Sequence, residues 1–346
     1  MNVEVDARPA SAGQERVSRG WQISRYRRTL GTLAGLAAIW ALFTALSDVF
    51  LTSTNIWNIL QQSANVGCVA AGLTVVLIAG EIDLSVGSLE AMAGAVAAVL
   101  MRDHGVPVPL GVLAGIAVTV GLGAVNGLLS WKFRFPSFIA TLAMLGIAQG
   151  SAFLLTNGAP VNRLPDAFRW LGTGKFGPVF VAVLITAAVY IVLHLVLTRT
   201  RLGLHIFAVG GNAESAGLQG ISPGRIKLYA LMISGCTAVI GGLILSARLN
   251  AGDGRFGEGD LLVAVAAVVI GGTSLFGGVG TVAGSAIGVV MIVSIKNGMV
   301  LLNVQDFWQR IVVGVIIVGA MGIDQLASGE RRLRLPEFGR ARGVAA

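Results

Sequence analysis

The feature that most constrains this chain is a succession of long stretches without charged residues. A membrane-spanning helix needs about 20 mostly apolar residues, because each residue adds about 1.5 Å along the helix axis. Such runs occur at Leu30–Ser47, Asn55–Gly80, Leu110–Trp131 and Pro178–Leu197. Only 12% of the residues are charged, against about 25% in soluble domains. Water solvates so uncharged a surface poorly, so we predict an all-α polytopic membrane protein.

The uncharged runs together predict about ten transmembrane helices. The other expected spans lie near 86–102, 138–156, 228–246, 261–272, 280–298 and 307–323. Leu261–Ile295 is too long for one span, and its Gly-rich segments at 271–272 and 277–280 divide it into two. The first of these two spans is short, so a complete span and a partly re-entrant segment both remain open.

The positions of Lys and Arg predict that both ends of the chain are cytoplasmic. Cytoplasmic segments carry an excess of these residues, and an even number of spans puts most of the 25 on the side of the N-terminus. We therefore predict a cytoplasmic N-terminal tail (1–28), a transmembrane domain (29–325) with a cytoplasmic loop (199–227), and a cytoplasmic C-terminal tail (326–346). Localisation in a plasma membrane is expected.

The net charge of +8 does not indicate a nucleic-acid-binding protein. Such a protein gathers its basic residues on one soluble face, whereas here they lie at the ends of apolar runs. The two cysteines, Cys68 and Cys236, lie inside apolar stretches and have no metal-binding spacing. We expect both to be small buried hydrophobic residues.

A weak internal repeat is visible in the chain. Val75–Gly80 precedes the Ile82–Ser88 turn, and Val268–Gly272 precedes the Thr273–Gly280 turn. Two halves of five spans each would be inverted relative to each other, because five is odd, and inverted repeats are common in transporters. Apolar runs also resemble each other by chance, so an inverted five-helix repeat and a coincidence both remain open.

Several enzyme motifs match literally but lack their partners. Gly220–Gly224 fits G-x-S-x-G, yet it lies in a polar loop without the required strand and helix. Gly257–Asp260 fits the G-x-G-D of intramembrane aspartyl proteases, but no second Asp follows a Tyr. We interpret it as a loop that ends in a helix N-cap at Asp260. The sequence has no G-x-x-x-x-G-K-[ST], so any ATP hydrolysis is expected in another polypeptide.

Polar residues inside the apolar runs are candidates for a translocation path. Charged groups at membrane depth are costly and usually functional, and neutral polar groups there can face an aqueous route. The candidates are Gln61, Gln62, Asn65, Glu81, Asp83, Ser85 and Glu90. For the amides, bonding between helices is the alternative. For Gly80–Ser88, the alternative is a solvated turn with Asp83 as N-cap.

The loop around residue 214 predicts a short helix. Asn212 is a good N-cap, Glu214 suits the positive end of the helix dipole, and Gly220 would end the helix. Arg201 and Arg225 flank it. Such a helix suits insertion into a groove of a cytoplasmic partner, and a plain surface helix is the alternative.

These segments resemble the ribose/xylose-type permease subunits of ABC sugar importers. The resemblance covers roughly residues 30–325. The motifs that carry it are Gly80–Ser88 (GEIDLSVGS), Gly211–Ile221 followed by Arg225 and Lys227, Ala267–Gly284 (AVVIGGTSLFGGVGTVAG), Asn297-Gly298, and Phe307-Trp308-Gln309 followed by Gly314. The resemblance implies a subunit that translocates a monosaccharide by alternating access, driven by a separate ATPase. It implies no enzyme activity or cofactor of its own.

The resemblance also implies the partners. These are a second permease copy, identical or different, two cytoplasmic ATP-binding subunits and a periplasmic sugar-binding protein. The expected ATPase-coupling helix comprises Asn212, Ala213, Glu214, Ser215, Ala216, Gly217, Leu218, Gln219 and Gly220. Family members usually carry bulkier Ala-Arg-Leu-Ser-type residues where this chain has 216–219, so the contacts are expected to differ in detail.

Two further expectations concern the route of the sugar. A path for a neutral sugar needs neutral hydrogen-bonding groups rather than charges. The cations on the outer side are candidates for docking an acidic face of the binding protein, namely Arg163, Arg169, Arg248 and Arg255.

Two other functions are possible on the residues alone. An autonomous secondary transporter of a small polar solute would use a buried coupling carboxylate such as Glu90. An intramembrane hydrolase would need paired Asp or Ser and His residues in facing spans. The sequence leaves open which sugar is carried and which residues form the gates.

Overall fold

The computed structural model describes residues 30–327, so nearly all of the two predicted tails lies outside the described residues. Within the described residues, ten helices lie at the positions of the predicted spans. They are Leu30–Leu46, α2 (Ser53–Ile78), α3 (Val86–Arg102), α4 (Val108–Lys132), α5 (Ser137–Leu155), α7 (Val181–Arg199), α10 (Pro223–Leu249), α11 (Asp260–Ile270), α12 (Val282–Leu301) and α13 (Asp306–Ala327). Within the described part, α2, α4, α5, α7, α10 and α12 are long and apolar enough to cross a membrane.

Short elements fill the connections between the long helices. They are α6 (Asp166–Thr173), α8 (Arg201–Gly211), α9 (Ala213–Leu218), and the strands β1 (Val161–Asn162), β2 (Lys175–Phe176), β3 (Val179–Phe180) and β4 (Ala251–Gly252). β1 pairs with β4 and β2 with β3, both antiparallel.

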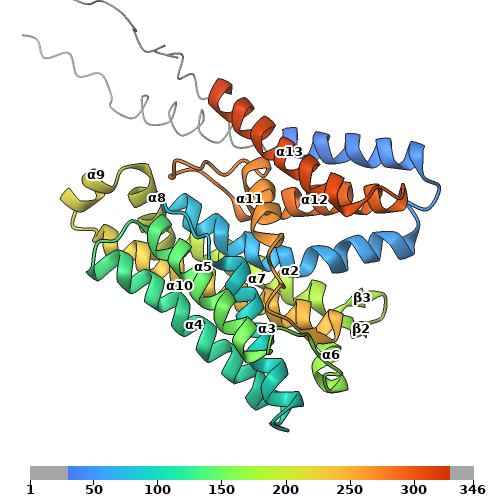
Figure 1. Ribbon diagram of the computed structural model, residues 1–346. Coiled ribbons are helices and arrows are strands. Elements are labelled where there is room, and N and C mark those ends of the chain that lie inside the picture. Colours follow the sequence, from blue (N-terminus) through green and yellow to red (C-terminus); the bar gives the residue numbers. More distant parts are fainter. Residues whose placement is uncertain (1–29, 328–346) are drawn as a thin grey trace, which may run out of the picture.

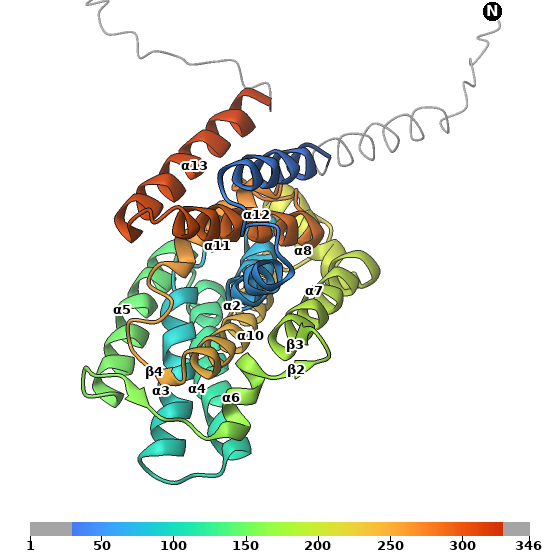
Figure 2. The same ribbon diagram turned by 90° about the vertical axis from the view of Figure 1, so that its right-hand side faces the viewer.

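Helices α2 and α10 pack against each other in the interior of the bundle (Figures 1 and 2). The most apolar 18-residue stretch of α2 is 83% buried, whereas that of α4 is only 22% buried. The exposed side chains of α4, α5 and α7 are largely Leu, Ile, Val and Phe. A helix surface of this kind is stable against lipid rather than water, which agrees with a polytopic membrane protein.

Two shorter helices, α3 and α11, begin inside the bundle. After each interior helix the chain turns back, over residues 79–85 before α3 and over 250–259 before α11. Gly87 and Gly257 touch, and a Cβ on either would overlap the carbonyl oxygen of the other. Gly257 also has a φ of +77°, which an L side chain rarely adopts. Glycines at these positions therefore allow the starts of the two helices to meet.

The helix contacts of the two halves correspond. α3 packs against α4 and α5, as α11 packs against α12 and α13, and α10 packs on α4 and α3, as α2 packs on α12 and α11. These contacts do not test the sequence match of Val75–Gly80 with Val268–Gly272, so the inverted repeat stays a prediction.

The two ends of the bundle differ in their connections. The "α6 end" carries α6, the strands and the 250–259 segment, and the "α9 end" carries α8 and α9 (Figure 1). At the α9 end, the backbones of Gly80, Gly210 and Gly277 are in contact, and Gly278 N donates to Ile78 O at 2.9 Å. The glycines of two sequence motifs thus meet in one place, where they permit close packing.

The two cysteines, both predicted to be buried, differ in their exposure. Cys68 is buried, as predicted. Cys236 is exposed, so the prediction is wrong for this residue. It lies on α10 between the buried residues Gly235 and Thr237, on a face that no helix in the described part of the chain covers.

Candidate functional site

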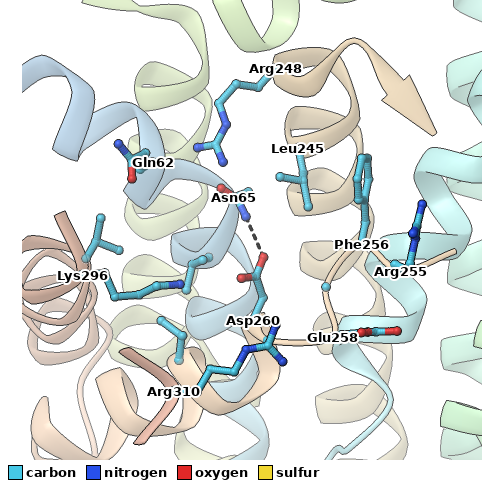
Figure 3. Close-up of a pocket in the computed structure, with 15 residues that line it drawn as sticks. Gln62, Asn65, Leu245, Arg248, Arg255, Phe256, Glu258, Asp260, Lys296 and Arg310 are labelled. Carbon is cyan, nitrogen blue, oxygen red and sulfur yellow. Dashed lines mark hydrogen bonds between the residues drawn. The ribbon is translucent and has the colours of Figure 1, made fainter. Parts of the chain in front are cut away.

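A polar cavity of about 420 Å³ lies toward the α6 end (Figure 3). Its volume falls within the range of small-molecule pockets, about 300–1,000 Å³. Its walls come from α2, α10, the 250–259 segment, α11, α12 and α13. The lining residues are Gln62, Asn65, Val66, Leu245, Arg248, Arg255, Phe256, Gly257, Glu258, Gly259, Asp260, Val263, Val293, Lys296 and Arg310.

The cavity reaches well into the bundle. Asn65 lies roughly 18 Å along α2 from its first residue, at about 1.5 Å per residue. Lys296 lies roughly 8 Å before the last residue of α12 by the same rise. Since the hydrocarbon core of a bilayer is about 30 Å thick, the floor of the cavity is near the middle of the bundle.

Asn65 connects three helices at the floor of the cavity. Its Nδ2 donates to Asp260 Oδ2 at 2.8 Å and to Glu90 Oε1 at 3.4 Å. The side chains of Asn65 and Glu90 are buried, and Asn65 Oδ1 and Glu90 Oε2 have no hydrogen-bond partner within the described residues. The Asn65 amide of α2 therefore bonds one carboxylate from α3 and one from α11. One oxygen of Asn65 and one of Glu90 remain beside the cavity without a hydrogen-bond partner within the described residues.

Three cations approach Asp260 from different helices (Figure 3). Arg248 of α10 is partly buried and donates through Nη1 to Gln61 O at 3.3 Å. Lys296 of α12 is also partly buried, whereas Arg310 of α13 is exposed and pairs with Asp306 at 3.2 Å. The cavity thus combines the partly buried Arg248 and Lys296 with the carboxylate of Asp260 and, behind Asn65, that of Glu90.

A further ion pair lies on the 250–259 segment, at the rim. Arg255 Nη2 bonds to Asp253 Oδ2 at 2.7 Å. The hydrogen bonds from the Arg255 guanidinium hold the pKa of Asp253 below its usual value. Figure 3 shows Arg255 and Glu258 on the far side of the segment from Asp260. This pair lies at the rim, and its two members bond to each other rather than to the charges inside the cavity.

The structure separates the predicted path residues into groups. Gln62 and Asn65 line the cavity, and Glu90 lies directly behind Asn65. Gln61 instead points toward α6, where its Nε2 donates to Gly172 O at 2.8 Å. The neighbouring side chains of Gln61 and Gln62 therefore make different contacts, because successive residues of a helix point about 100° apart.

The remaining predicted path residues lie nearer the α9 end. Glu81 forms an ion pair with Lys227, and both line a second cavity of about 490 Å³. Asp83 Oδ1 accepts hydrogen bonds from Ser85 N at 2.9 Å and Ser85 Oγ at 2.6 Å. Asn126 Nδ2 donates to Ser85 Oγ at 2.9 Å. These groups form a buried network separate from the first cavity.

Both predicted N-caps, for the helices that follow segments 79–85 and 250–259, are wrong. Ser85, not Asp83, occupies the N-cap of α3, and Asp83 instead closes a turn by accepting from Ser85 N. Gly259 occupies the N-cap of α11, and Asp260 is its first residue. The carboxylate of Asp260 is bonded by Asn65 of another helix rather than by its own backbone.

Sequence reasoning missed part of the cavity. The expectation of a path lined by neutral groups does not describe this cavity, because Lys296, Arg310 and Asp260 line it. One signal was present for Lys296, which interrupts a long apolar run that continues on both sides. Asp260 and Arg310 follow loops, so nothing in their local sequence distinguishes them from ordinary residues at helix starts.

The predicted short helix is confirmed as α9. Asn212 Oδ1 accepts from Ser215 N at 2.8 Å, and Gly220 has a φ of +82° just beyond the helix. Ala216 is buried, whereas Leu218 is 87% exposed. A leucine so exposed at the tip of a short helix is a candidate contact for a partner.

The four predicted docking cations lie at the α6 end in different settings. Arg163 is exposed, and Arg169 pairs with Asp166 at 2.8 Å. Arg255 is exposed at the rim, but Arg248 is partly buried and lines the cavity. Three of them are therefore accessible on the surface, and Arg248 belongs to the interior.

A family described as "Branched-chain amino acid transport system / permease component" matches residues 55–321. The ribose import permease protein of Escherichia coli (strain K12) is 39% identical over 297 residues, which cover 85% of this chain and 92% of that protein. No solved structure matches.

Relatives with other named sugars show similar identity. The xylose transport system permease protein of Haemophilus influenzae is 35% identical over 84% of this chain and 94% of its own length. The L-arabinose ABC transporter permease protein of Azospirillum brasilense is 36% identical over 82% of this chain and 83% of its own length. The resemblance seen in the sequence motifs is thus confirmed across most of the chain. The chain belongs to this family of transport-system permease components and is a relative of the ribose and xylose permeases.

Proposed function

We propose that this chain is the permease subunit of an ABC importer that carries a monosaccharide across the bacterial inner membrane. The names of the relatives, which refer to ribose, xylose and L-arabinose, support this substrate class. The chain works by alternating access, and ATP is hydrolysed by a separate subunit. Its partners are a second permease copy, two cytoplasmic ATP-binding subunits and a periplasmic sugar-binding protein.

The proposed topology has ten spans with both termini in the cytoplasm. The ten helices at the positions of the predicted spans and the excess of Lys and Arg on one side support it. In this orientation the α9 end is cytoplasmic and the α6 end is periplasmic. The corresponding helix contacts of the two halves support an inverted five-helix repeat, in which α3 and α11 are half-helices that meet inside the membrane.

The observation that carries the proposal is the exposed tip of α9. Residues 212–220 form the coupling helix, with Leu218 entering a groove of the ATPase. Burying one leucine contributes about 1.5–3 kcal/mol, enough to matter in a docking contact. Nucleotide then biases the equilibrium between inward- and outward-facing states, because the ATPase pair binds the two states with different affinity.

The polar cavity is the proposed start of the path. Sugar released by the binding protein enters at the α6 end and meets Gln62 and Asn65. The ion pair of Glu81 with Lys227 lies toward the cytoplasmic exit, and the Asp83–Ser85 network lies between the two. Arg163, Arg169 and Arg255 are positioned for docking an acidic face of the binding protein.

The test is to co-express the chain with its ATPase and binding protein and to compare Leu218→Ser with Leu204→Ser. Leu204 is also exposed in the α8–α9 loop region, at 67%, but lies outside residues 212–220. Leu218→Ser is expected to reduce ATPase co-purification and sugar uptake about tenfold, a change of about 1.4 kcal/mol. Leu204→Ser is expected to leave both unchanged.

Two outcomes would contradict the proposal. Full co-purification and uptake with Leu218→Ser would show that α9 is not the coupling helix. Uptake by the chain without any ATPase subunit would favour a secondary transporter, in which the buried Glu90 is the candidate coupling carboxylate.

A further inference from the structure

The ion pair between Glu81 and Lys227 differs from the other ion pairs of the described residues. Those others join residues two to four positions apart in the sequence, namely Asp166 with Arg169, Asp253 with Arg255, and Asp306 with Arg310. The Glu81–Lys227 pair instead joins segment 79–85 to the start of α10, in the other half of the chain. It therefore holds together two parts of the fold that the local chain does not connect.

The start of α10 is joined to α9 by packing as well as by the chain (Figure 1). Residues 219–222 alone separate the two helices. Ala216 of α9 and Ile226 of α10 are buried in one hydrophobic cluster, and Ile221 packs against it. Ile221 N also donates to Ala216 O at 3.1 Å. A displacement of α9 therefore also moves the start of α10, because closely packed side chains transmit strain.

The chain before α9 contacts the same turn from another element, α8. A Cβ on Gly210, near the end of α8, would overlap the carbonyl oxygen of Ile78, and a Cβ on Gly80 would be in van der Waals contact with Gly210. Residues 78–81 are thus in contact with Gly210, which precedes α9, and with Lys227, which follows it. Both ends of the loop that carries α9 therefore meet one turn of the chain.

That turn continues directly into α3, and α3 reaches the polar cavity. Near the start of α3, Gly87 touches Gly257, which belongs to the cavity wall. One turn further along, Glu90 Oε1 accepts a hydrogen bond at 3.4 Å from Asn65, at the floor of the cavity. A displacement of segment 79–85 together with α3 therefore acts on both the wall and the floor of the cavity.

We propose that the Glu81–Lys227 ion pair couples ATP hydrolysis to transport, by carrying the displacement of α9 to α3 and to the polar cavity. The inference rests on the proposed function, in which α9 contacts the ATPase. Glu81 is buried and Lys227 is partly exposed, and burial strengthens the attraction between the two charges. Both residues line the second cavity, of about 490 Å³, so there is space beside the pair in which it can move.

A purely stabilising role for the pair predicts different behaviour. Loss of a stabilising contact lowers the amount of folded complex, so ATP hydrolysis and sugar import fall in equal proportion. Loss of a coupling contact lowers import more than hydrolysis, because the ATPase cycle no longer biases the state of the cavity. The deciding quantity is therefore the number of sugar molecules imported for each ATP hydrolysed.

The experiment measures this ratio in lipid vesicles that contain the chain with its ATPase, supplied with the binding protein. The probe is whichever of D-ribose, D-xylose and L-arabinose the wild-type complex imports. The double variant Glu81→Gln with Lys227→Met removes both charges and leaves no buried charge unpaired, so it is expected to fold. Its ratio is expected to fall about tenfold. The ATPase should still co-purify, because α9 is unchanged.

Two matched variants separate the ion pair from its surroundings. Lys227→Arg keeps the positive charge beside Glu81 and is expected to retain the wild-type ratio. Arg134→Gln removes an exposed cation of the same cavity that forms no ion pair among the described residues, and it should also retain the ratio. Thermal unfolding verifies that each variant is folded. If the double variant does not fold, Glu81→Gln alone replaces it, because water then solvates the partly exposed Lys227.

The outcomes distinguish this inference from the proposed function. A folded variant without the ion pair that keeps the wild-type ratio overturns the inference and leaves sugar import intact. A fall in import and ATP hydrolysis in equal proportion also overturns it, since the pair then only stabilises the fold. An equal loss of the ratio in Arg134→Gln assigns the effect to the cavity as a whole and not to the pair. Only a wild-type complex that imports none of the sugars contradicts the proposed function, and the inference falls with it.

Discussion

The two segments that lead from an interior helix into a helix that begins inside the bundle differ in their side chains. Segment 79–85 leads from α2 to α3, and segment 250–259 leads from α10 to α11. The first is fastened to neighbouring helices: Leu84 N donates to Thr141 Oγ1 at 3.1 Å, and Asn126 donates to Ser85. The second pairs with β1 at its start, then carries exposed charges and forms a wall of the polar cavity.

The difference indicates that two segments in similar positions have different roles in the protein. In the first segment, buried polar groups are bonded to the surrounding helices, so the segment stabilises the bundle. The second segment and Asp260, the first residue of α11 after it, face a cavity and retain charges that packing alone does not require. We therefore assign stability mainly to segment 79–85 and solute contact mainly to segment 250–259. Four variants test this assignment.

The largest effect is expected where the two segments meet. Gly257→Val places a β-branched side chain at a φ of +77°, in overlap with the carbonyl of Gly87. We expect a loss of at least about 3 kcal/mol of stability and little folded protein. Gly259→Ala is the control, because its Cβ would have no heavy atom within 4 Å. The yield of monodisperse protein distinguishes the two, and equal yields would contradict the close meeting of the helix starts.

The second variant tests the anchored segment. Asp83→Ala removes the acceptor of two hydrogen bonds from Ser85 and leaves buried donors without a partner. The expected loss is about 1–3 kcal/mol, seen as a lower unfolding temperature. Asp103→Ala, at an exposed position after α3, should change stability by less than about 0.5 kcal/mol. An unchanged unfolding temperature for Asp83→Ala would remove the stabilising role of this segment.

The third variant tests the cavity wall. Asp260→Asn keeps the shape of the side chain but removes the charge that faces Arg248 and Lys296. Stability should change by less than about 1 kcal/mol, whereas solute-dependent uptake should fall about tenfold. Asp166→Asn, which removes an exposed carboxylate of the α6 end, should alter neither quantity. A large loss of stability with normal uptake would reverse the assignment of the two segments.

The smallest effect concerns the rim and depends on pH. Because Arg255 lowers the pKa of Asp253 in the folded protein, the pair adds stability above the unfolded pKa of about 3.9. That contribution is lost as the pH falls through the lower folded value. The unfolding temperature of the wild type should exceed that of Asp253→Asn from pH 7 down to about pH 4, and the two should converge below. A gap that widens in acid would contradict the sign of this linkage.

The amino-acid sequence by itself predicted the positions of the apolar helices and of the short helix α9. A run of about 20 apolar residues and an N-cap such as Asn212 act through neighbours in the chain, so they can be recognised locally. The Gly-rich motifs identified the family for the same reason. The sequence did not show which residues the side chains of these motifs contact in the folded protein.

The tertiary structure decided which polar side chains meet. Gln61 and Gln62 are neighbours, yet one bonds to α6 and the other faces the cavity. Asp260 was expected to cap its own helix, but it is bonded by Asn65, and Lys296 joins them from α12. Such contacts depend on how distant helices pack, and the sequence around each residue carries no information about that packing.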